Sequence, residues 1–81
     1  MRVQVLHFAS AREAAGCASE TIDLPDGATV ADAKDALSKR HPRLGPAWGS
    51  IRFALGERFA AAEETLEGGD VLALIPPVSG G

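Results

Sequence analysis

One helical segment, bounded by Thr29 and Pro42, dominates the pattern of this 81-residue sequence. Thr29 is a favoured N-cap residue, and Asp32 follows it near the positive end of the helix dipole. Pro42 ends the segment, because the residue before a proline disfavours helical dihedral angles. Between these limits an apolar stripe recurs at helical spacing and predicts one buried helix face; its residues are Val30, Ala33, Ala36 and Leu37. The rest of the chain must pack around this one helix.

Short alternating apolar segments on both sides of the helix predict strands, because successive side chains of a strand point to opposite faces. The expected strands are residues 3–8, 21–24, 51–55, 58–60 and 71–75. Gly56 and Glu57 fit a two-residue hairpin turn between the third and fourth strands. Residues 43–50 are expected to be a connection, and residues 63–66 a brief helical turn.

A short helical turn is expected between the first two strands, over residues 11–15. Ser10 and Glu13 stand three positions apart at its start, which predicts a capping box. Gly16 is suited to the left-handed conformation that ends such a turn. The first two strands therefore form a hairpin interrupted by this turn.

A sheet covered by one helix is an α+β architecture. We predict one domain over residues 1–75, with about five strands and the main helix on one face, followed by a tail over residues 76–81. A chain of 81 residues has a small core and little room for a deep substrate pocket. This size argues against an enzyme with a self-contained active site.

Composition narrows the possible functions. The net charge of −3 comes without a basic stripe, so nucleic acid is not an expected partner. No apolar run approaches the length of a membrane span, and no signal peptide is expected. Cys17 is the single cysteine, which indicates a reducing, cytoplasmic compartment. We expect Cys17 to be an unreactive loop thiol, His41 to be a helix-end residue, and no metal to be bound.

The sequence ends in Pro76-Pro77-Val78-Ser79-Gly80-Gly81. Both prolines lack an N–H donor, so they are expected to end the last strand and to hold the chain extended. Gly80 and Gly81 have no side chains and fit a narrow channel in another protein. We expect the terminal carboxylate to be a chemical handle that is offered to such a channel.

An apolar surface is expected beside this tail. The last strand places Val71 and Ile75 on the face opposite to Leu72 and Leu74, where an uncovered sheet is normally polar. If Phe8 and Phe59 join Val71 and Ile75, they form an exposed apolar patch of the kind that marks an interface. The alternative is that some of these side chains belong to the core.

The element order and the Gly-Gly ending resemble the ubiquitin-like β-grasp family, and within it the molybdopterin synthase small subunits. The resemblance covers essentially the whole chain. It is carried by Phe8-Ala9, Arg12-Glu13, Thr29-Val30, Leu66-Glu67-Gly68-Gly69-Asp70 and the segment from Ile75 to Gly81. The double proline distinguishes this ending from that of most sulfur carriers of the thiamine pathway.

This resemblance implies a mixed sheet and a sulfur-carrier function. It implies that an ATP-dependent adenylyltransferase activates Gly81, that a thiocarboxylate forms there, and that its sulfur goes to cyclic pyranopterin monophosphate. The chain itself is expected to bind no cofactor. Contacts with a large subunit, in a heterotetramer of two small and two large chains, are implied for Phe8, Phe59, Ile75, Pro76, Pro77, Val78 and Ser79.

Three other functions stay open from the sequence. The chain could deliver sulfur to another pathway, such as thiamine or another thiolated product. It could be a protein modifier that is joined through Gly81 to lysines of target proteins. It could also be an interaction domain whose tail does no chemistry.

Overall fold

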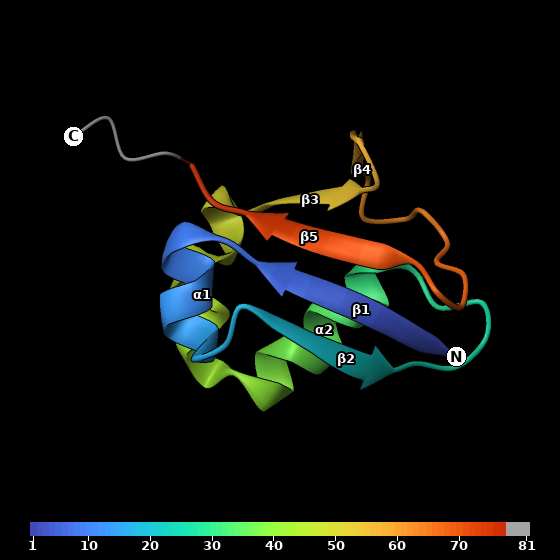
Figure 1. Cartoon of the computed structure of the whole chain (residues 1–81), viewed down its shortest axis with the longest axis horizontal. Coiled ribbons are helices and arrows are strands. Elements are labelled where there is room, and N and C mark those ends of the chain that lie inside the picture. Colours follow the sequence, from blue (N-terminus) through green and yellow to red (C-terminus); the bar gives the residue numbers. More distant parts are fainter. Residues whose placement is uncertain (78–81) are drawn as a thin grey trace.

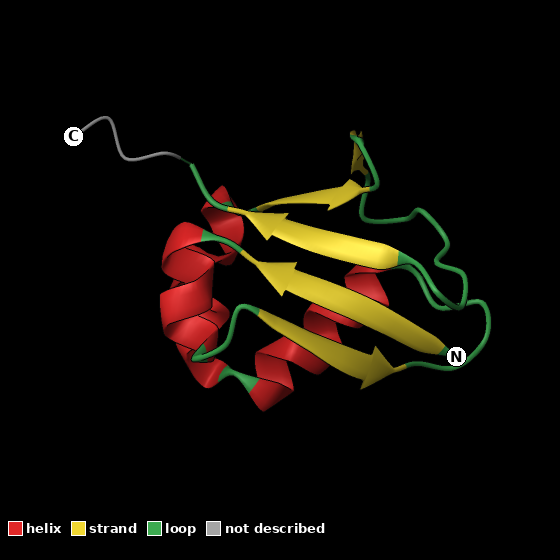
Figure 2. Cartoon of the chain, viewed as in Figure 1, coloured by secondary structure: helices red, strands yellow, loops and turns green. Residues whose placement is uncertain are grey.

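The computed structural model describes residues 1–77. In Figures 1 and 2 a sheet lies in front of the long helix, and a shorter helix lies at one end of the sheet. None of the described helices has the length and apolar character needed to span a lipid bilayer. In chain order the elements are β1 (Arg2–His7), α1 (Ala9–Ala15), β2 (Ser19–Asp23), α2 (Val30–Arg40), the 3₁₀ helix η1 (Pro42–Ser50), β3 (Arg52–Leu55), β4 (Arg58–Ala60) and β5 (Val71–Ile75).

The five strands form one mixed sheet in the order β2-β1-β5-β3-β4. β1 runs antiparallel to β2 and parallel to β5, while β3 runs antiparallel to both β4 and β5. Parallel neighbours need a crossover connection, and α2 forms part of it on one face of the sheet. The predicted α+β architecture with one main helix is therefore confirmed.

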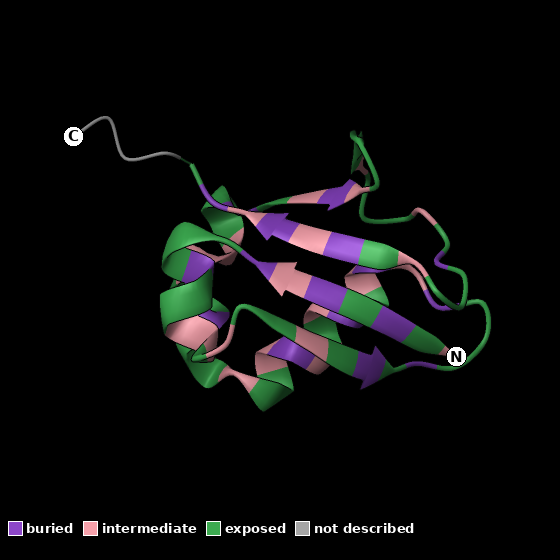
Figure 3. Cartoon of the chain, in the orientation of Figure 1, coloured by how far each residue is buried: buried purple, intermediate pink, exposed green. Residues whose placement is uncertain are grey.

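The core lies between the sheet and α2. Alternate residues of β1 and β5 are fully buried, and Figure 3 shows this alternation along both strands. The predicted apolar stripe of α2 faces them, and η1 adds Leu44. The largest fully buried apolar side chains of the core are those of Val3, Val5, Val30, Leu37, Leu44, Leu66, Leu72 and Leu74.

The start of α2 is fixed by a reciprocal capping box between Thr29 and Asp32. The Asp32 amide donates to the Thr29 hydroxyl at 3.3 Å, and the Thr29 amide donates to the Asp32 carboxylate at 2.9 Å. Two amides that the helix leaves unpaired are thereby satisfied. The predicted N-cap is confirmed, and the paired carboxylate makes it stronger than Thr29 alone.

Replacing Thr29 by alanine is expected to lower the free energy of unfolding by about 1 kcal/mol, because the Asp32 amide loses its acceptor. Urea unfolding followed by circular dichroism measures this change. Serine at the same position keeps the hydroxyl and is the matched control. Equal stability of Thr29→Ala and the parent chain would show that the capping box contributes nothing.

The start of α1 differs from the prediction. Phe8 is its N-cap, no side chain caps it, and Ser10 lies inside the helix, so the predicted capping box of Ser10 and Glu13 is wrong. The Phe8 amide still donates to the Leu74 carbonyl at 3.3 Å, so the chain passes from the sheet into α1 without an intervening turn. Gly16 ends the helix at a φ of 77°, as predicted.

Two connections also differ from the prediction. Residues 43–50, which were expected to be a connection, belong to the 3₁₀ helix η1 (Pro42–Ser50), which has Pro42 in its first turn. Residues 63–66 are not helical. Thr65 pairs with Thr29, and the Glu64 carbonyl accepts the Val30 amide at 2.9 Å. This segment forms its backbone hydrogen bonds with the chain entering α2 instead of within itself.

Candidate functional site

The face of the sheet that turns away from α2 carries a row of apolar residues. Strand register places Leu6 beside Ala73, Ala73 beside Ala54, and Ala54 beside Phe59. Among the described residues, no helix covers this face (Figure 1). These apolar residues therefore form a continuous row across the uncovered face, from Leu6 on β1 to Phe59 on β4.

Three large apolar side chains are exposed: Phe8 by 48%, Phe59 by 60% and Val71 by 36%. Ile75 is half-buried and belongs to the same face. We call Phe8, Phe59, Val71 and Ile75 the apolar patch. The alternative that Phe8 and Phe59 belong to the core is wrong.

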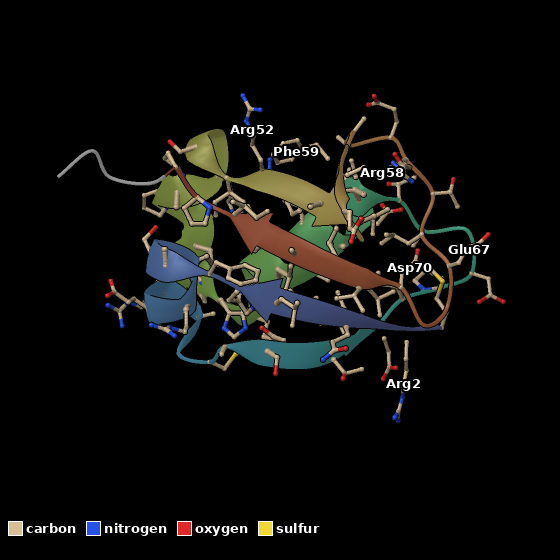
Figure 4. All side chains as sticks on the ribbon, turned by 45° about the horizontal axis from the view of Figure 1, so that its top comes forward. Arg2, Arg52, Arg58, Phe59, Glu67 and Asp70 are labelled. Atoms are coloured by element: carbon tan, nitrogen blue, oxygen red, sulfur yellow. The ribbon has the colours of Figure 1, made fainter. Side chains whose placement is uncertain are left out.

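A shallow groove runs along the patch between β4 and the end of β5. Ala54, Gly56, Glu57, Arg58, Phe59 and Ile75 line it. Arg52 pairs with Ile75 in register, and its guanidinium lies 5.4 Å from the centre of the Phe59 ring. Figure 4 shows Arg52 and Phe59 together at this edge of the sheet. The groove thus combines an aromatic surface with a cation.

The two prolines after β5 differ in their surroundings. Pro76 is buried and Pro77 is exposed. A buried Pro76 ties the base of the tail to the domain, while Pro77 presents its ring to the surroundings. The remaining predicted tail residues, Val78, Ser79, Gly80 and Gly81, lie outside the described residues.

A second group of side chains meets on the inner side of the sheet, close to the end of β1. The Nε2 atoms of His7 and His41 each lie 2.6 Å from Oε2 of Glu20. The Cys17 thiol donates to the same oxygen at 3.6 Å, and Arg40 donates to the other oxygen, Oε1, at 2.8 Å. One carboxylate thus contacts four side chains from three segments of the chain: β1, the residues after α1, and the end of α2.

The electrostatics of this cluster favour an ionised Glu20. Partial burial alone would raise the pKa of Glu20, but the hydrogen bonds from Arg40, His7 and His41 outweigh it and lower the pKa to about 2. Burial, followed by the charge of Glu20, raises the pKa of the Cys17 thiol. The thiol is therefore protonated at neutral pH and is a weak nucleophile.

The sequence analysis treated Cys17 and His41 separately and did not predict this cluster. A signal was nevertheless present in the strand pattern. Alternation from Ile22 places Glu20 on the inner face of β2, and alternation from Val5 places His7 on the inner face of β1. Polar residues at inner positions of two paired strands indicate a specific interaction, because buried charges are normally paired.

The fold and the exposed patch beside the tail define a ubiquitin-like β-grasp protein. The sequence matches the ThiS family over residues 5–81, and the chain belongs to that family. The predicted membership of the β-grasp sulfur-carrier group is therefore confirmed.

Individual relatives are similar over their full length. The molybdopterin synthase sulfur carrier subunit of Chlamydomonas reinhardtii is 39% identical, with 100% of both chains aligned. The crystal structure of SAMP1, small archaeal modifier protein 1, from Haloferax volcanii has a TM-score of 0.91 and 36% identity, with 100% of both chains covered. A chain in the complex of subunits 1 and 2 of molybdopterin-converting factor from Helicobacter pylori has a TM-score of 0.73 and 26% identity, again with 100% of both chains covered.

Proposed function

We propose that this chain is the sulfur carrier subunit of a molybdopterin synthase. The observation that carries the proposal is full-length similarity to proteins of that name, joined to an uncovered apolar patch beside the base of a Gly-Gly tail. The β-grasp domain is the platform in this proposal, and Gly81 is the reacting residue. The domain spans residues 1–75, and the tail spans residues 76–81.

Sulfur loading needs activation because a carboxylate is a poor electrophile. An ATP-dependent adenylyltransferase converts the Gly81 carboxylate into a mixed anhydride with AMP and releases pyrophosphate. A sulfur donor then attacks the carbonyl carbon, the bond to AMP breaks, and a thiocarboxylate remains on Gly81. The thiocarboxylate is ionised at neutral pH and is a soft nucleophile. ATP is thus used by the partner, and the carrier needs no bound cofactor.

The large subunit supplies the active site in this proposal. The Gly81 thiocarboxylate enters that site and transfers its sulfur to cyclic pyranopterin monophosphate. Each carrier delivers one sulfur atom and a dithiolene holds two, so two loaded chains are consumed for each molybdopterin. A heterotetramer of two small and two large subunits satisfies this requirement, and we place the reaction in the cytoplasm.

The surface of the domain supports binding of a large subunit. The similar chain from Helicobacter pylori is part of a complex of two different subunits. In the present chain Phe59 and Ile75 of the apolar patch line one groove at the end of β5, so a partner that covers them also lies next to the first tail residues. The exposed Pro77 and the residues Val78, Ser79 and Gly80 then extend toward the partner's active site.

One experiment tests this function in a single turnover. The thiocarboxylated chain is mixed with a candidate large subunit and cyclic pyranopterin monophosphate. We expect a dithiolene product, together with the return of a carboxylate at the C-terminus. A product that requires free sulfide, with the thiocarboxylate left intact, would contradict the proposal.

A modifier function is the second candidate, because small archaeal modifier protein 1 of Haloferax volcanii is 40% identical, with 91% of this chain and 94% of that protein aligned. A modifier uses the same activated Gly81 but forms an amide bond with a lysine amine of a target. Co-expression with an activating enzyme separates the two functions. Lysine conjugates detected by mass analysis support a modifier, and a free thiocarboxylate supports a carrier.

A further inference from the structure

The cluster around Glu20 on the inner face of the sheet includes four residues of types that commonly bind metals: His7, Cys17, Glu20 and His41. One donor atom from each of His7, Cys17, Glu20 and His41 lies within 4.8 Å of the donor atoms of the other three. We propose that these four side chains form a binding site for a zinc ion. The proposal is independent of the sulfur-carrier function, because it involves neither the tail nor the apolar patch.

The donor set selects the class of metal. One thiolate, two imidazoles and one carboxylate supply four ligands, which is the coordination number that zinc adopts in structural sites. Magnesium and calcium prefer oxygen ligands throughout and fit this set poorly. A zinc ion with one thiolate and one carboxylate has no net charge, which suits a site where His7 is buried.

The donor atoms lie between 2.6 Å and at most 4.8 Å apart, a range that includes the spacing of a tetrahedral site. Zinc bonds of about 2.0–2.3 Å place neighbouring donors roughly 3.3–3.7 Å apart. The distance from Cys17 Sγ to Glu20 Oε2 is already 3.6 Å. The two histidine nitrogens lie closer to this oxygen, at 2.6 Å, which is the spacing of hydrogen bonds. An ion that replaces these protons requires donor movements of roughly 1 Å, within the reach of side-chain rotation.

The four ligands are held by separate backbone segments that the fold already fixes. His7 lies on β1 and pairs with Leu74, Cys17 follows the end of α1, and His41 is the C-cap residue of α2. The two imidazole rings are nearly perpendicular, at 87°, with their centres 5.7 Å apart. Arg40 donates to Oε1 of Glu20 and to the Thr21 carbonyl, which leaves Oε2 of Glu20 facing the other donors. Such outer contacts orient metal ligands.

His7 is a polar residue at a core position, and packing alone does not explain it. Its side chain is fully buried, and its Nδ1 atom has no hydrogen-bond partner among the described residues. An unpaired buried nitrogen destabilises a fold, whereas an apolar side chain at this inner position would simply pack with Val3 and Val5. A local conflict of this kind is expected where a residue serves a function other than packing.

Cobalt titration of the chelator-treated full chain tests the site. We expect one cobalt ion per chain, intense visible absorption from tetrahedral coordination, and a near-ultraviolet charge-transfer band that requires a cobalt–thiolate bond. Zinc should displace the cobalt. At a free zinc concentration about one hundred times Kd, Tm should rise by about 10 °C.

Variants identify the ligands. Cys17→Ser and His41→Gln should each weaken zinc binding at least about tenfold, and Cys17→Ser should also abolish the charge-transfer band. Glu13→Gln removes an exposed carboxylate outside the cluster and should bind as the parent chain does. Circular dichroism without metal confirms that each variant is folded. Absence of the charge-transfer band in the parent chain, or equal zinc affinity of Cys17→Ser, would overturn the proposal.

Discussion

Deletion of Gly81 is expected to abolish sulfur transfer while the fold stays intact. The proposed chemistry takes place on the Gly81 carboxylate, and its removal moves the reacting carbon back by one residue along the tail. A shift of this size misplaces the reacting carbon, because reacting atoms must lie about 3–3.5 Å from each other in an active site. The cluster of buried core residues lies within residues 3–74, so deletion of Gly81 takes no side chain from it.

Two measurements on the same preparation separate these effects. Molybdopterin formation should fall to background for the deleted chain, and Tm should match that of the parent. Gly45→Ala is a suitable control, since it changes an exposed glycine with open space around the added methyl group and should leave both values unchanged. Normal product formation by the chain without Gly81 would remove that residue from the reaction.

Replacement of Ile75 by aspartate is expected to weaken large-subunit binding about 30-fold or more, the effect of losing about 2 kcal/mol at an interface centre. Ile75 lies on the uncovered face in register with Arg52, beside the exposed Phe59. A partner that covers this groove would bury the new carboxylate. The free domain should lose only about 1 kcal/mol, because Ile75 is half-buried on this face.

Titration calorimetry below the unfolding range of both proteins gives the affinity. Gln4→Asp is the matched control: it adds the same charge to an exposed position of β1 on the same face, farther from the tail. An affinity of Ile75→Asp equal to that of Gln4→Asp would exclude Ile75 from the interface.

Much of the fold follows from the sequence because its strongest signals are local. The helix between Thr29 and Pro42 is bounded by an N-cap and a proline, and both act within a few residues. Alternation also assigned Leu72 and Leu74 to the core and Val71 to the surface, which the burial of β5 confirms. The exposure of Phe8 and Phe59 depends on strand register, and for this reason it stayed open until the structure was known.

The features that sequence reasoning missed depend on contacts between distant segments. Ser10 and Glu13 fit a capping box, but Phe8 still donates to the Leu74 carbonyl of β5, and the helix begins two residues earlier than predicted. The cluster around Glu20 needs the pairing of β1 with β2 and the return of α2 to bring His41 into place. No local sequence pattern predicts that these distant side chains come into contact. A carboxylate at an inner strand position nevertheless indicates that a partner for it lies nearby.

The central claim is that the terminal carboxylate of Gly81 is the site of sulfur loading. Intact-mass analysis, after reaction with the activating enzyme, ATP and a sulfur donor, tests it most directly. The account predicts a mass increase equal to the exchange of one oxygen for one sulfur, located in the C-terminal peptide. A chain of unchanged mass, or one with sulfur on Cys17 instead, would contradict it.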